Sequence, residues 1–405
     1  MRLRILLPLV ALMTAALLQA SAGCSSLKEA DPADPGGEAG ADGTIDPQGE
    51  AGGDGAAADG AVDPDGGPAA ETCTQTTCTV ETLYKNLYGP VSLAVNSTHL
   101  YWLEVGPTTT RPGGYGELVR VAKTFTCKTA SCFDILDDTF FSGQLQGQNI
   151  YEAHVALGLN DVCYTQSFNT NAEHTVRCFA LSTLARRPFD DGPGALIDLW
   201  VGTTEARWVL ASTTGSSADG LVRGRALGGD AGARTIAGGL RNPIGVSSDG
   251  TRTYWTELGP ASPQGLVSMV AADGGVATPP TGRPNPTAIR LYGQYLYWIE
   301  ASKKVIMRGR ADGSGAPEQI ATTDDNPVDL VVDASGVYWI ASGVGSSGVA
   351  GSLSHAPLEP NGVITIMVKD INLVYALAAD TTHVYVASVG QMIADGQIVR
   401  IKKTR

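Results

Sequence analysis

Four similar pentapeptides decide how this chain folds. They are Leu100-Tyr101-Trp102-Leu103-Glu104, Thr253-Tyr254-Trp255-Thr256-Glu257, Leu296-Tyr297-Trp298-Ile299-Glu300 and Val337-Tyr338-Trp339-Ile340-Ala341. Weaker copies are Val162-Cys163-Tyr164-Thr165-Gln166, Ala206-Arg207-Trp208-Val209-Leu210 and Val384-Tyr385-Val386-Ala387. The tryptophan positions are 102, 164, 208, 255, 298, 339 and 386, at spacings of 62, 44, 47, 43, 41 and 47 residues. This spacing indicates an internal repeat of seven units.

Each unit contains signals for four short strands. Nine residues before every tryptophan position stands an aliphatic residue: Leu93, Val155, Leu199, Val246, Ile289, Leu330 and Leu377. Asn-Pro or Gly-Pro pairs precede several of these aliphatic residues, which we call anchors. After the aromatic strand comes another apolar run, such as residues 118–121 of the first unit, and then a turn, such as residues 311–313 of the fifth unit. Four short strands per repeat are typical of a β-propeller blade. The sequence therefore predicts an all-β, seven-bladed propeller of four-stranded antiparallel blades.

The ends of the array predict how the ring closes. The last unit stops after its third strand, at residues 397–401, and lacks a fourth. Residues 79–84 form a strand-like segment directly before the first unit. We expect this segment to be the outer strand of the seventh blade, because closure protects strand edges that an array otherwise leaves open. The alternative is an open ring, or six blades with one degenerate unit.

Residues 1–23 have the form of a signal peptide. Arg2 and Arg4 precede an apolar run, residues 5–18, that is too short for a membrane-spanning helix. The small residues that lead to Cys24 resemble the bacterial lipobox, which implies cleavage after residue 23 and a lipid on Cys24. Ser21 stands where that motif prefers an aliphatic residue, so simple secretion with cleavage nearby is the alternative.

Residues 24–72 are predicted to be the lipid-attachment cysteine and a disordered tether. Residues 25–72 hold 11 Gly, 11 Ala, 5 Pro and 12 acidic residues against a single Lys28, with no aromatic residue. Such a coil reaches about 40 Å. Most of the chain's net charge of −13 therefore belongs to the tether, and nothing suggests a nucleic-acid partner. Ser25 and Ser26 after the cysteine favour an outer-membrane or cell-surface location, facing outward or toward the periplasm.

Six further cysteines fall into neighbouring pairs. An even, locally paired set in an exported chain predicts the disulfides Cys73–Cys78, Cys127–Cys132 and Cys163–Cys178. Cys163 and Cys178 belong to adjacent antiparallel strands of the second unit, which places them face to face. A zinc site is the alternative, but it prefers other spacings or histidines nearby.

A family resemblance rests on these motifs. Tyr254-Trp255-Thr256-Glu257 resembles the YWTD signature of the low-density-lipoprotein-receptor propellers, with Glu in place of Asp, and the chain is similar to YWTD-like and TolB-like β-propellers. The tether, the CxxxxC pairs and the Val-Tyr-Trp units together resemble uncharacterised propeller lipoproteins abundant in myxobacteria. The resemblance covers about residues 73–405 and implies a fold rather than a function.

Seven positions, each directly before an aliphatic anchor, are predicted to surround the mouth of the central channel: Ser92, His154, Asp198, Gly245, Ala288, Asp329 and Ala376. His154, Asp198 and Asp329 have the chemistry to bind a divalent cation. The resemblance to seven-bladed lyases and six-bladed lactonases implies the same use. The alternative is that each polar residue hydrogen-bonds a neighbouring blade or channel water.

The loops after the aromatic strands vary most among the units. Residues 105–117, with Arg111 and Tyr115, form the longest, followed by residues 167–174, with His174, and residues 213–220. Variable loops on a rigid scaffold are where binding specificity usually resides, so Arg111, Tyr115 and His174 are candidate binding residues. By contrast, Glu104, Glu257 and Glu300 belong to different units and are predicted to be structural acceptors.

The sequence favours a non-enzymatic function. We expect a monomeric, lipid-anchored binding or scaffolding propeller for an envelope protein or glycan, without a cofactor. A metal-dependent lyase or hydrolase at the channel mouth, and a structural component of the envelope, are the alternatives.

Overall fold

The computed structural model describes residues 78–104, 116–124, 133–137, 150–168, 173–212, 217–259, 265–271, 276–277, 281–342, 350–389 and 395–403. All of them belong to one compact unit, Glu71–Arg405. Every regular element among them is a β-strand, and none of their segments is a helix with the length and apolarity that crossing a bilayer requires. The predicted signal peptide, Cys24 and the tether lie outside the described residues and stay predictions.

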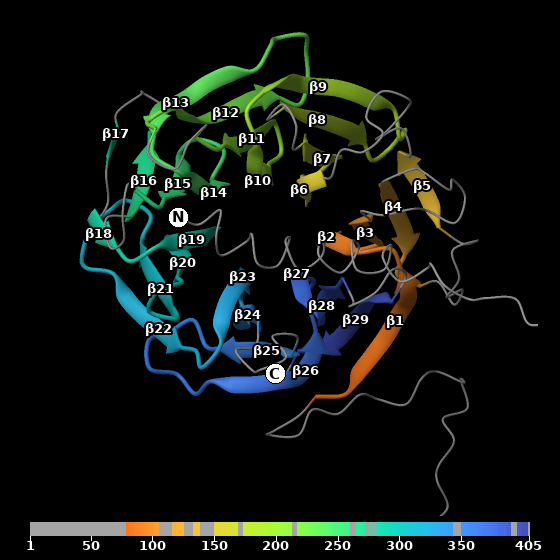
Figure 1. Cartoon of the computed structure of the whole chain (residues 1–405), viewed down its shortest axis with the longest axis vertical. Helices are drawn as coiled ribbons and strands as arrows, with labels where there is room; N and C mark the ends of the chain where they lie inside the picture. The colour runs from red at the N-terminus through yellow and green to blue at the C-terminus, as the bar shows by residue number, and fades with distance from the viewer. Residues whose placement is uncertain are drawn as a thin grey trace, which may run out of the picture. The chain divides into compact units, whose positions relative to one another are not determined.

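The strands form seven antiparallel sheets (Figure 1). Blade one consists of β2 (Pro90–Val95), β3 (His99–Glu104), β4 (Glu117–Ala122) and β5 (Asp134–Asp137). Blade two consists of β6 (Ile150–Leu157), β7 (Asp161–Phe168), β8 (Glu173–Ala180) and β9 (Arg186–Pro193). Blade three consists of β10 (Leu196–Val201), β11 (Glu205–Leu210), β12 (Gly220–Ala226) and β13 (Arg234–Leu240). Blade four consists of β14 (Pro243–Ser248), β15 (Thr253–Glu257), β16 (Gly265–Val270), β17 (Val276–Ala277) and β18 (Thr281–Arg283). Blade five consists of β19 (Pro286–Tyr292), β20 (Tyr295–Glu300), β21 (Val305–Arg310) and β22 (Glu318–Thr322). Blade six consists of β23 (Asn326–Asp333), β24 (Gly336–Ser342), β25 (Ala350–Ala356) and β26 (Thr365–Asn372). Blade seven consists of β27 (Val374–Ala379), β28 (His383–Ser388), β29 (Gly396–Lys402) and β1 (Val80–Leu87).

The seven sheets form a closed ring. Their innermost strands contact one another in the cyclic order β27, β2, β6, β10, β14, β19, β23 and back to β27. The prediction of a seven-bladed propeller with four-stranded blades is confirmed. Blade four differs in one detail, because both β17 and β18 pair with β16 at its outer side.

The ring closes through the two ends of the propeller sequence. Strand β1 pairs antiparallel with β29, with Val80 opposite Ile401 and Leu87 opposite Gly396. Arg400 forms an ion pair with Glu81 across this joint, Nη2 to Oε2 at 2.6 Å. The segment that we expected to supply the missing outer strand therefore does so, and the open-ring and six-blade alternatives are wrong.

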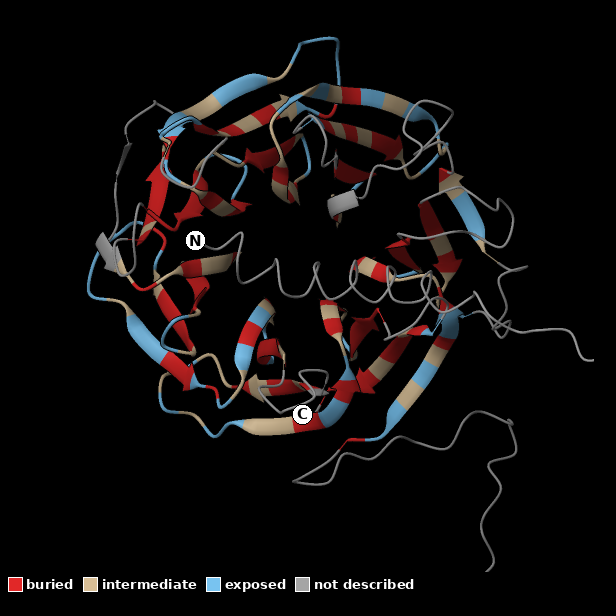
Figure 2. Ribbon diagram, in the orientation of Figure 1, coloured by how far each residue is buried: buried red, intermediate tan, exposed pale blue. Residues whose placement is uncertain are grey.

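The aromatic residues of the repeat lie between blades. Because side chains alternate along a strand, Trp102 packs toward blade seven, with Tyr84 and Tyr385, whereas Tyr101 packs toward blade two, with Tyr164. The same division holds in the other blades that carry the Tyr-Trp pair. The second strands are consequently buried along most of their length (Figure 2).

A bulge recurs at the start of every innermost strand. In blade one it lies between Pro90 and Ser92, and in blade four between Pro243 and Gly245. Asn242 precedes the bulge with a φ of 51°, and Gly89 takes the same place with a φ of 69°. Asn and Gly tolerate this left-handed conformation best, which explains the Gly-Pro pair at Gly89 and the Asn-Pro pairs at Asn242 and Asn285.

Candidate functional site: the channel mouth

An arginine joins the residues that the sequence proposed as metal ligands. Arg290, on β19, donates from Nη2 to Oδ1 of Asp329 at 2.9 Å, and its Nη1 lies 3.7 Å from Oδ2 of Asp198. Asp329 also interacts electrostatically with Asp198 and with His154. The structure thus brings Asp329 of blade six and Asp198 of blade three together at Arg290, and Asp329 also interacts with His154 of blade two.

Burial and the Arg290 guanidinium have opposite effects on the pKa of Asp329. Burial raises the pKa of Asp329 above its ordinary value, although Arg290 acts to lower it. Burial alone would lower the pKa of Arg290, but Asp329 and Asp198 outweigh that effect and raise it. Arg290 therefore keeps its charge and acts as the counterion of two carboxylates. Within the described ranges, no group of three or more His, Cys, Asp or Glu side chains has the geometry to hold a metal ion, so the divalent cation stays a prediction.

Two of the seven residues predicted to surround the channel mouth form hydrogen bonds to the neighbouring blade. The Ser92 hydroxyl accepts the backbone N–H of Val155 in the next blade at 2.9 Å. The Asp198 carboxylate, through Oδ2, accepts the N–H of Val246 at 3.0 Å. These acceptors satisfy backbone donors that burial would otherwise leave unpaired. At Ser92 and Asp198 the alternative interpretation, a hydrogen bond to the adjacent blade, is therefore confirmed.

The repeated glutamates are structural acceptors, as predicted. Oε1 of Glu104 accepts the indole N–H of Trp102 at 2.8 Å, and Oε2 accepts the backbone N–H of Tyr88 at 3.2 Å. Glu257 binds the indole of Trp255 at 2.9 Å and the N–H of Arg241 at 2.9 Å. Each carboxylate thus binds the tryptophan of its own blade and a backbone N–H of the connection that leads into that blade.

Glu300 shows the same arrangement with one replacement. It accepts from the Trp298 indole at 3.5 Å, and the guanidinium of Arg283 supplies the second contact at 3.2 Å. The residue that matches Tyr88 and Arg241 is Pro284, which has no N–H to donate. A side-chain donor thus takes over the task of a missing backbone donor.

His174 is buried instead of lying in an exposed loop. Strand β8 begins at Glu173, so His174 belongs to a strand, and its side chain is 1% exposed. Its Nδ1 lies 3.0 Å from the carbonyl oxygen of Gly194, and its Nε2 lies 3.2 Å from Oδ2 of Asp190. The expectation that His174 lies in a loop is therefore wrong, because β8 begins at Glu173 and the ring contacts β9 and the β9–β10 connection. Binding of a partner by His174 stays a prediction. Arg111 and Tyr115 lie outside the described residues.

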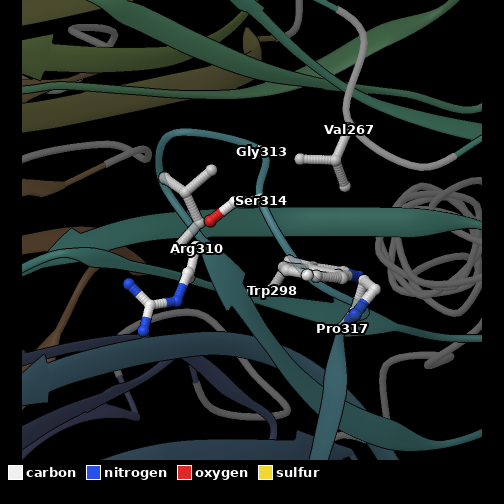
Figure 3. Close-up of a pocket in the computed structure, with 9 residues that line it drawn as sticks. Val267, Trp298, Arg310, Gly313, Ser314 and Pro317 are labelled. Carbon is white, nitrogen blue, oxygen red and sulfur yellow. The ribbon is translucent and has the colours of Figure 1, made fainter.

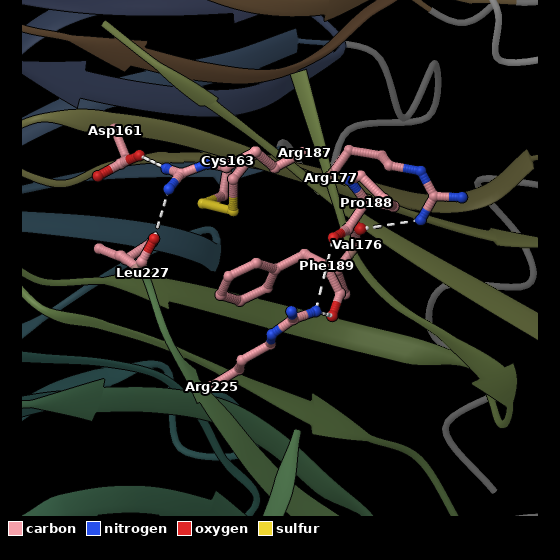
Figure 4. Close-up of a disulfide and its surroundings, with 10 residues drawn as sticks. Asp161, Cys163, Val176, Arg177, Arg187, Pro188, Phe189, Arg225 and Leu227 are labelled. Carbon is pink, nitrogen blue, oxygen red and sulfur yellow. Dashed lines mark hydrogen bonds and ion pairs between the residues drawn. A yellow bond between two sulfur atoms is a disulfide. The ribbon is translucent and has the colours of Figure 1, made fainter. Parts of the chain in front are cut away.

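The disulfide of blade two is present as predicted (Figure 4). Cys163 and Cys178 are direct partners on β7 and β8, and both are fully buried. Cys163 stands where other blades carry the tyrosine that faces the next blade, so a covalent bond replaces an aromatic contact. Arg187 of the same blade donates to the carbonyl of Leu227 in blade three at 2.5 Å. Cys78 is also disulfide-bonded, whereas Cys73, Cys127 and Cys132 lie outside the described residues.

A small gap between blades four and five is a packing defect and no binding site. It measures about 10 Å³ and lies beside the Trp298 indole, Val267 and the turn at Gly313 (Figure 3). A volume of this size admits about one water molecule.

Comparison of the sequence with protein-family models and with curated proteins finds no match. Among solved structures, virginiamycin B lyase from Staphylococcus aureus has a TM-score of 0.55 at 11% identity and covers 80% of this chain and 99% of its own. A structure from a study of two prolyl endopeptidases has a TM-score of 0.53 at 10% identity, over 75% of this chain and 46% of its own. A nidogen/laminin complex matches 57% of this chain and 78% of its own, at 13% identity and a TM-score of 0.40.

The likeness is one of fold. The structures with TM-scores above 0.5 share the propeller fold with this chain at 10–11% identity. These structures belong to a lyase and to a study of two prolyl endopeptidases, and a shared fold does not imply a shared function, so the function of this propeller has to be argued from its own residues.

Proposed function

We propose that this propeller is a non-enzymatic binding or scaffolding module of the cell envelope. A lipid on Cys24 and an acidic tether would hold it at the outer membrane or cell surface. It would engage a protein or a glycan through the face that carries the blade-to-blade connections and the loops after the second strands. The signal-like start, the lipobox-like sequence and the cysteine pairs support this location.

One observation carries the non-enzymatic part of the proposal. The carboxylates that sequence patterns single out are already engaged: Glu104 and Glu257 hold tryptophans, and Asp329 is paired with Arg290. General acid–base catalysis needs a group that is free to exchange a proton with a substrate. A rigid ring with variable loops is instead suited to binding.

Membrane fractionation tests the anchor. The Cys24→Ser variant should move from the membrane fraction to the soluble fraction, because it lacks the acylated thiol. Ser25→Ala, next to the anchor, is the matched control and should stay in the membrane. Retention of Cys24→Ser would contradict lipid anchoring.

Binding to isolated envelopes tests the second half. The full chain should bind envelope fractions saturably, and replacement of residues 106–115 by a Gly-Ser linker should weaken that binding while leaving thermal unfolding unchanged. Unchanged binding after loop replacement would favour the structural-component alternative.

A metal-dependent lyase or hydrolase is the second candidate, and one observation favours it: Asp329 interacts electrostatically with both Asp198 and His154. Elemental analysis of the purified chain separates the two functions. A stoichiometric divalent metal that is lost in Asp198→Asn and Asp329→Asn would support the enzyme. A metal-free chain that still binds envelopes would support the binding module.

A further inference from the structure

Blade six lacks an acceptor that its tryptophan needs. The residue two positions after the tryptophan position is Glu in blades one, four and five, and the seven residues in blade order are Glu104, Gln166, Leu210, Glu257, Glu300, Ala341 and Ser388. Trp339 is 1% exposed, and within the part of the chain that the structure describes its indole N–H donates to no acceptor. The Trp339 indole nitrogen is not among the buried polar atoms that lack a partner in the described chain, whereas the Trp208 nitrogen is, so the Trp339 nitrogen is open to an acceptor from outside the chain.

The missing side chain leaves a cavity. Ala341 and Trp339 both line a space of about 360 Å³, which falls within the range of small-molecule pockets, about 300–1,000 Å³. Blade three offers the contrast. There Leu210 fills the equivalent place and is 3% exposed, and the Trp208 indole nitrogen is sealed from solvent without a partner in the described chain. In blade six the small side chain of Ala341, two residues after the tryptophan, leaves this place open.

The walls of the cavity are polar and come from two blades. The connection between β22 and β23 contributes Thr323, Asp324 and Asp325, and blade six contributes Ser354, Lys369 and Asp370. This connection lies on the face where blades join, the face we propose for binding. None of the four charged side chains forms an ion pair with another described residue.

We propose that this cavity binds a neutral saccharide, an inference that rests on the proposed binding function and names its ligand class. Sugar hydroxyls both donate and accept hydrogen bonds. The carboxylates of Asp324, Asp325 and Asp370 accept from them, and the Trp339 indole donates to a hydroxyl, ring or acetamido oxygen. Three carboxylates against one ammonium leave the pocket negative, which disfavours sugars that carry a carboxylate.

Calorimetric titration of the full chain tests the proposal. The probes are glucose, galactose, mannose and N-acetylglucosamine, with glucuronic acid as the anionic comparison. We expect at least one neutral sugar to bind, and glucuronic acid to bind at least tenfold more weakly than glucose or not at all.

Two variants locate the binding. Ala341→Glu supplies the acceptor that blades one, four and five possess, so it should reduce saccharide affinity at least tenfold while the thermal unfolding temperature stays the same or rises. Asp370→Asn, at an exposed position, should weaken binding without affecting folding. Asp312→Ala, in an exposed turn of blade five outside the cavity, is the matched control and should bind as the unaltered chain does.

Three results would overturn the pocket: no neutral sugar binds, Ala341→Glu and Asp370→Asn both bind normally, or glucuronic acid binds more tightly than glucose. If these occur while the chain still binds envelope fractions saturably, the proposed function stands and the saccharide pocket fails. If the sugar binds through Ala341 but the chain does not bind envelopes, the pocket stands and the proposed function fails.

Discussion

The indole nitrogen of Trp102 donates a hydrogen bond to Oε1 of Glu104, two residues further along the same strand, at 2.8 Å. The carboxylate is buried, and burial raises its pKa although the hydrogen bonds from Trp102 and Tyr88 act to lower it. The motif is thus a self-contained hydrogen-bonded unit that lets a blade bury a tryptophan together with its polar atom.

Removing this acceptor should destabilise the propeller. Glu104→Ala leaves two buried donors, the Trp102 indole and the Tyr88 N–H, without a partner, and we expect a loss of about 2–4 kcal/mol. Glu104→Gln keeps one acceptor oxygen and should lose less. Urea denaturation measures both. Glu173→Ala, at an exposed strand position, is the control, and equal midpoints for Glu104→Ala and this control would contradict the structural role.

Asp380 should make the propeller sensitive to acid. Burial alone would raise the pKa of Asp380, but hydrogen bonds from Lys123, Thr382, His383 and Tyr385 lower it below its ordinary value. A depressed carboxyl pKa contributes stability at neutral pH that is lost as the pH falls below about 4 toward the folded-state pKa. Asp380→Asn should therefore be less stable by about 2 kcal/mol at pH 7, and the difference should shrink in acid. Thermal melts from pH 7 to pH 3 check this, with the exposed Asp230→Asn as control; a difference that is constant with pH would argue against the ion pair with Lys123.

Arg290 should stabilise the propeller by balancing the charges of Asp198 and Asp329. Arg290→Met removes the cation that lowers the pKa of Asp329, so that pKa rises further. A carboxyl whose folded-state pKa exceeds its unfolded value favours the folded state as the pH falls through that pKa. The variant should lose about 1–2 kcal/mol at pH 7 and recover part of it at pH 5. Lys85→Met, at an exposed position, is the control, and a variant as stable as this control at both values of pH would exclude the counterion role.

The disulfide of blade two should be both stabilising and protected. The bridge closes a loop of sequence separation 15, for which cross-linking contributes about 3 kcal/mol. The double variant Cys163→Ala/Cys178→Ala should lose a comparable amount in urea denaturation. In the unaltered chain, dithiothreitol followed by a thiol reagent should label these buried cysteines only after denaturant is added. Labelling of Cys163 or Cys178 in the native state would show that the blade opens locally.

The closing strand should be required for a discrete monomer. Removal of residues 1–87 exposes the edge of β29, which can then pair with another chain. Size-exclusion chromatography with light scattering should show self-association or broad unfolding. Removal of residues 1–72 keeps β1 and is the control. A monodisperse, cooperatively folding 88–405 chain would refute the importance of the closure.

Most of the fold could be predicted from the sequence because the residues that define the repeat are buried between neighbouring blades. Tyr101 and Trp102 face opposite neighbouring blades, so a recurring Tyr-Trp pair specifies a ring of sheets. The Glu104 acceptor role was predictable for a related reason, since Glu recurs at the same position in blades one, four and five and each of the three belongs to a different blade.

The site was harder to predict. Arg290 directly follows its aliphatic anchor, Ile289, whereas the predicted channel residues are those directly before the anchors. His174 was assigned to a loop because hairpin length cannot be read from composition. The blade-six cavity arises from a missing side chain, and the only sequence signal for it is Ala341 where three other blades have Glu.

The joint between β1 and β29 sets an order on how the molecule forms. The first strand of the propeller finds its partner only when residues 396–402, the last strand of the propeller, are available. Until then β1 is an unpaired strand and blade seven is incomplete. Closure of the ring therefore comes after synthesis of all seven blades, an order that would suit the export of an unfolded chain that we propose.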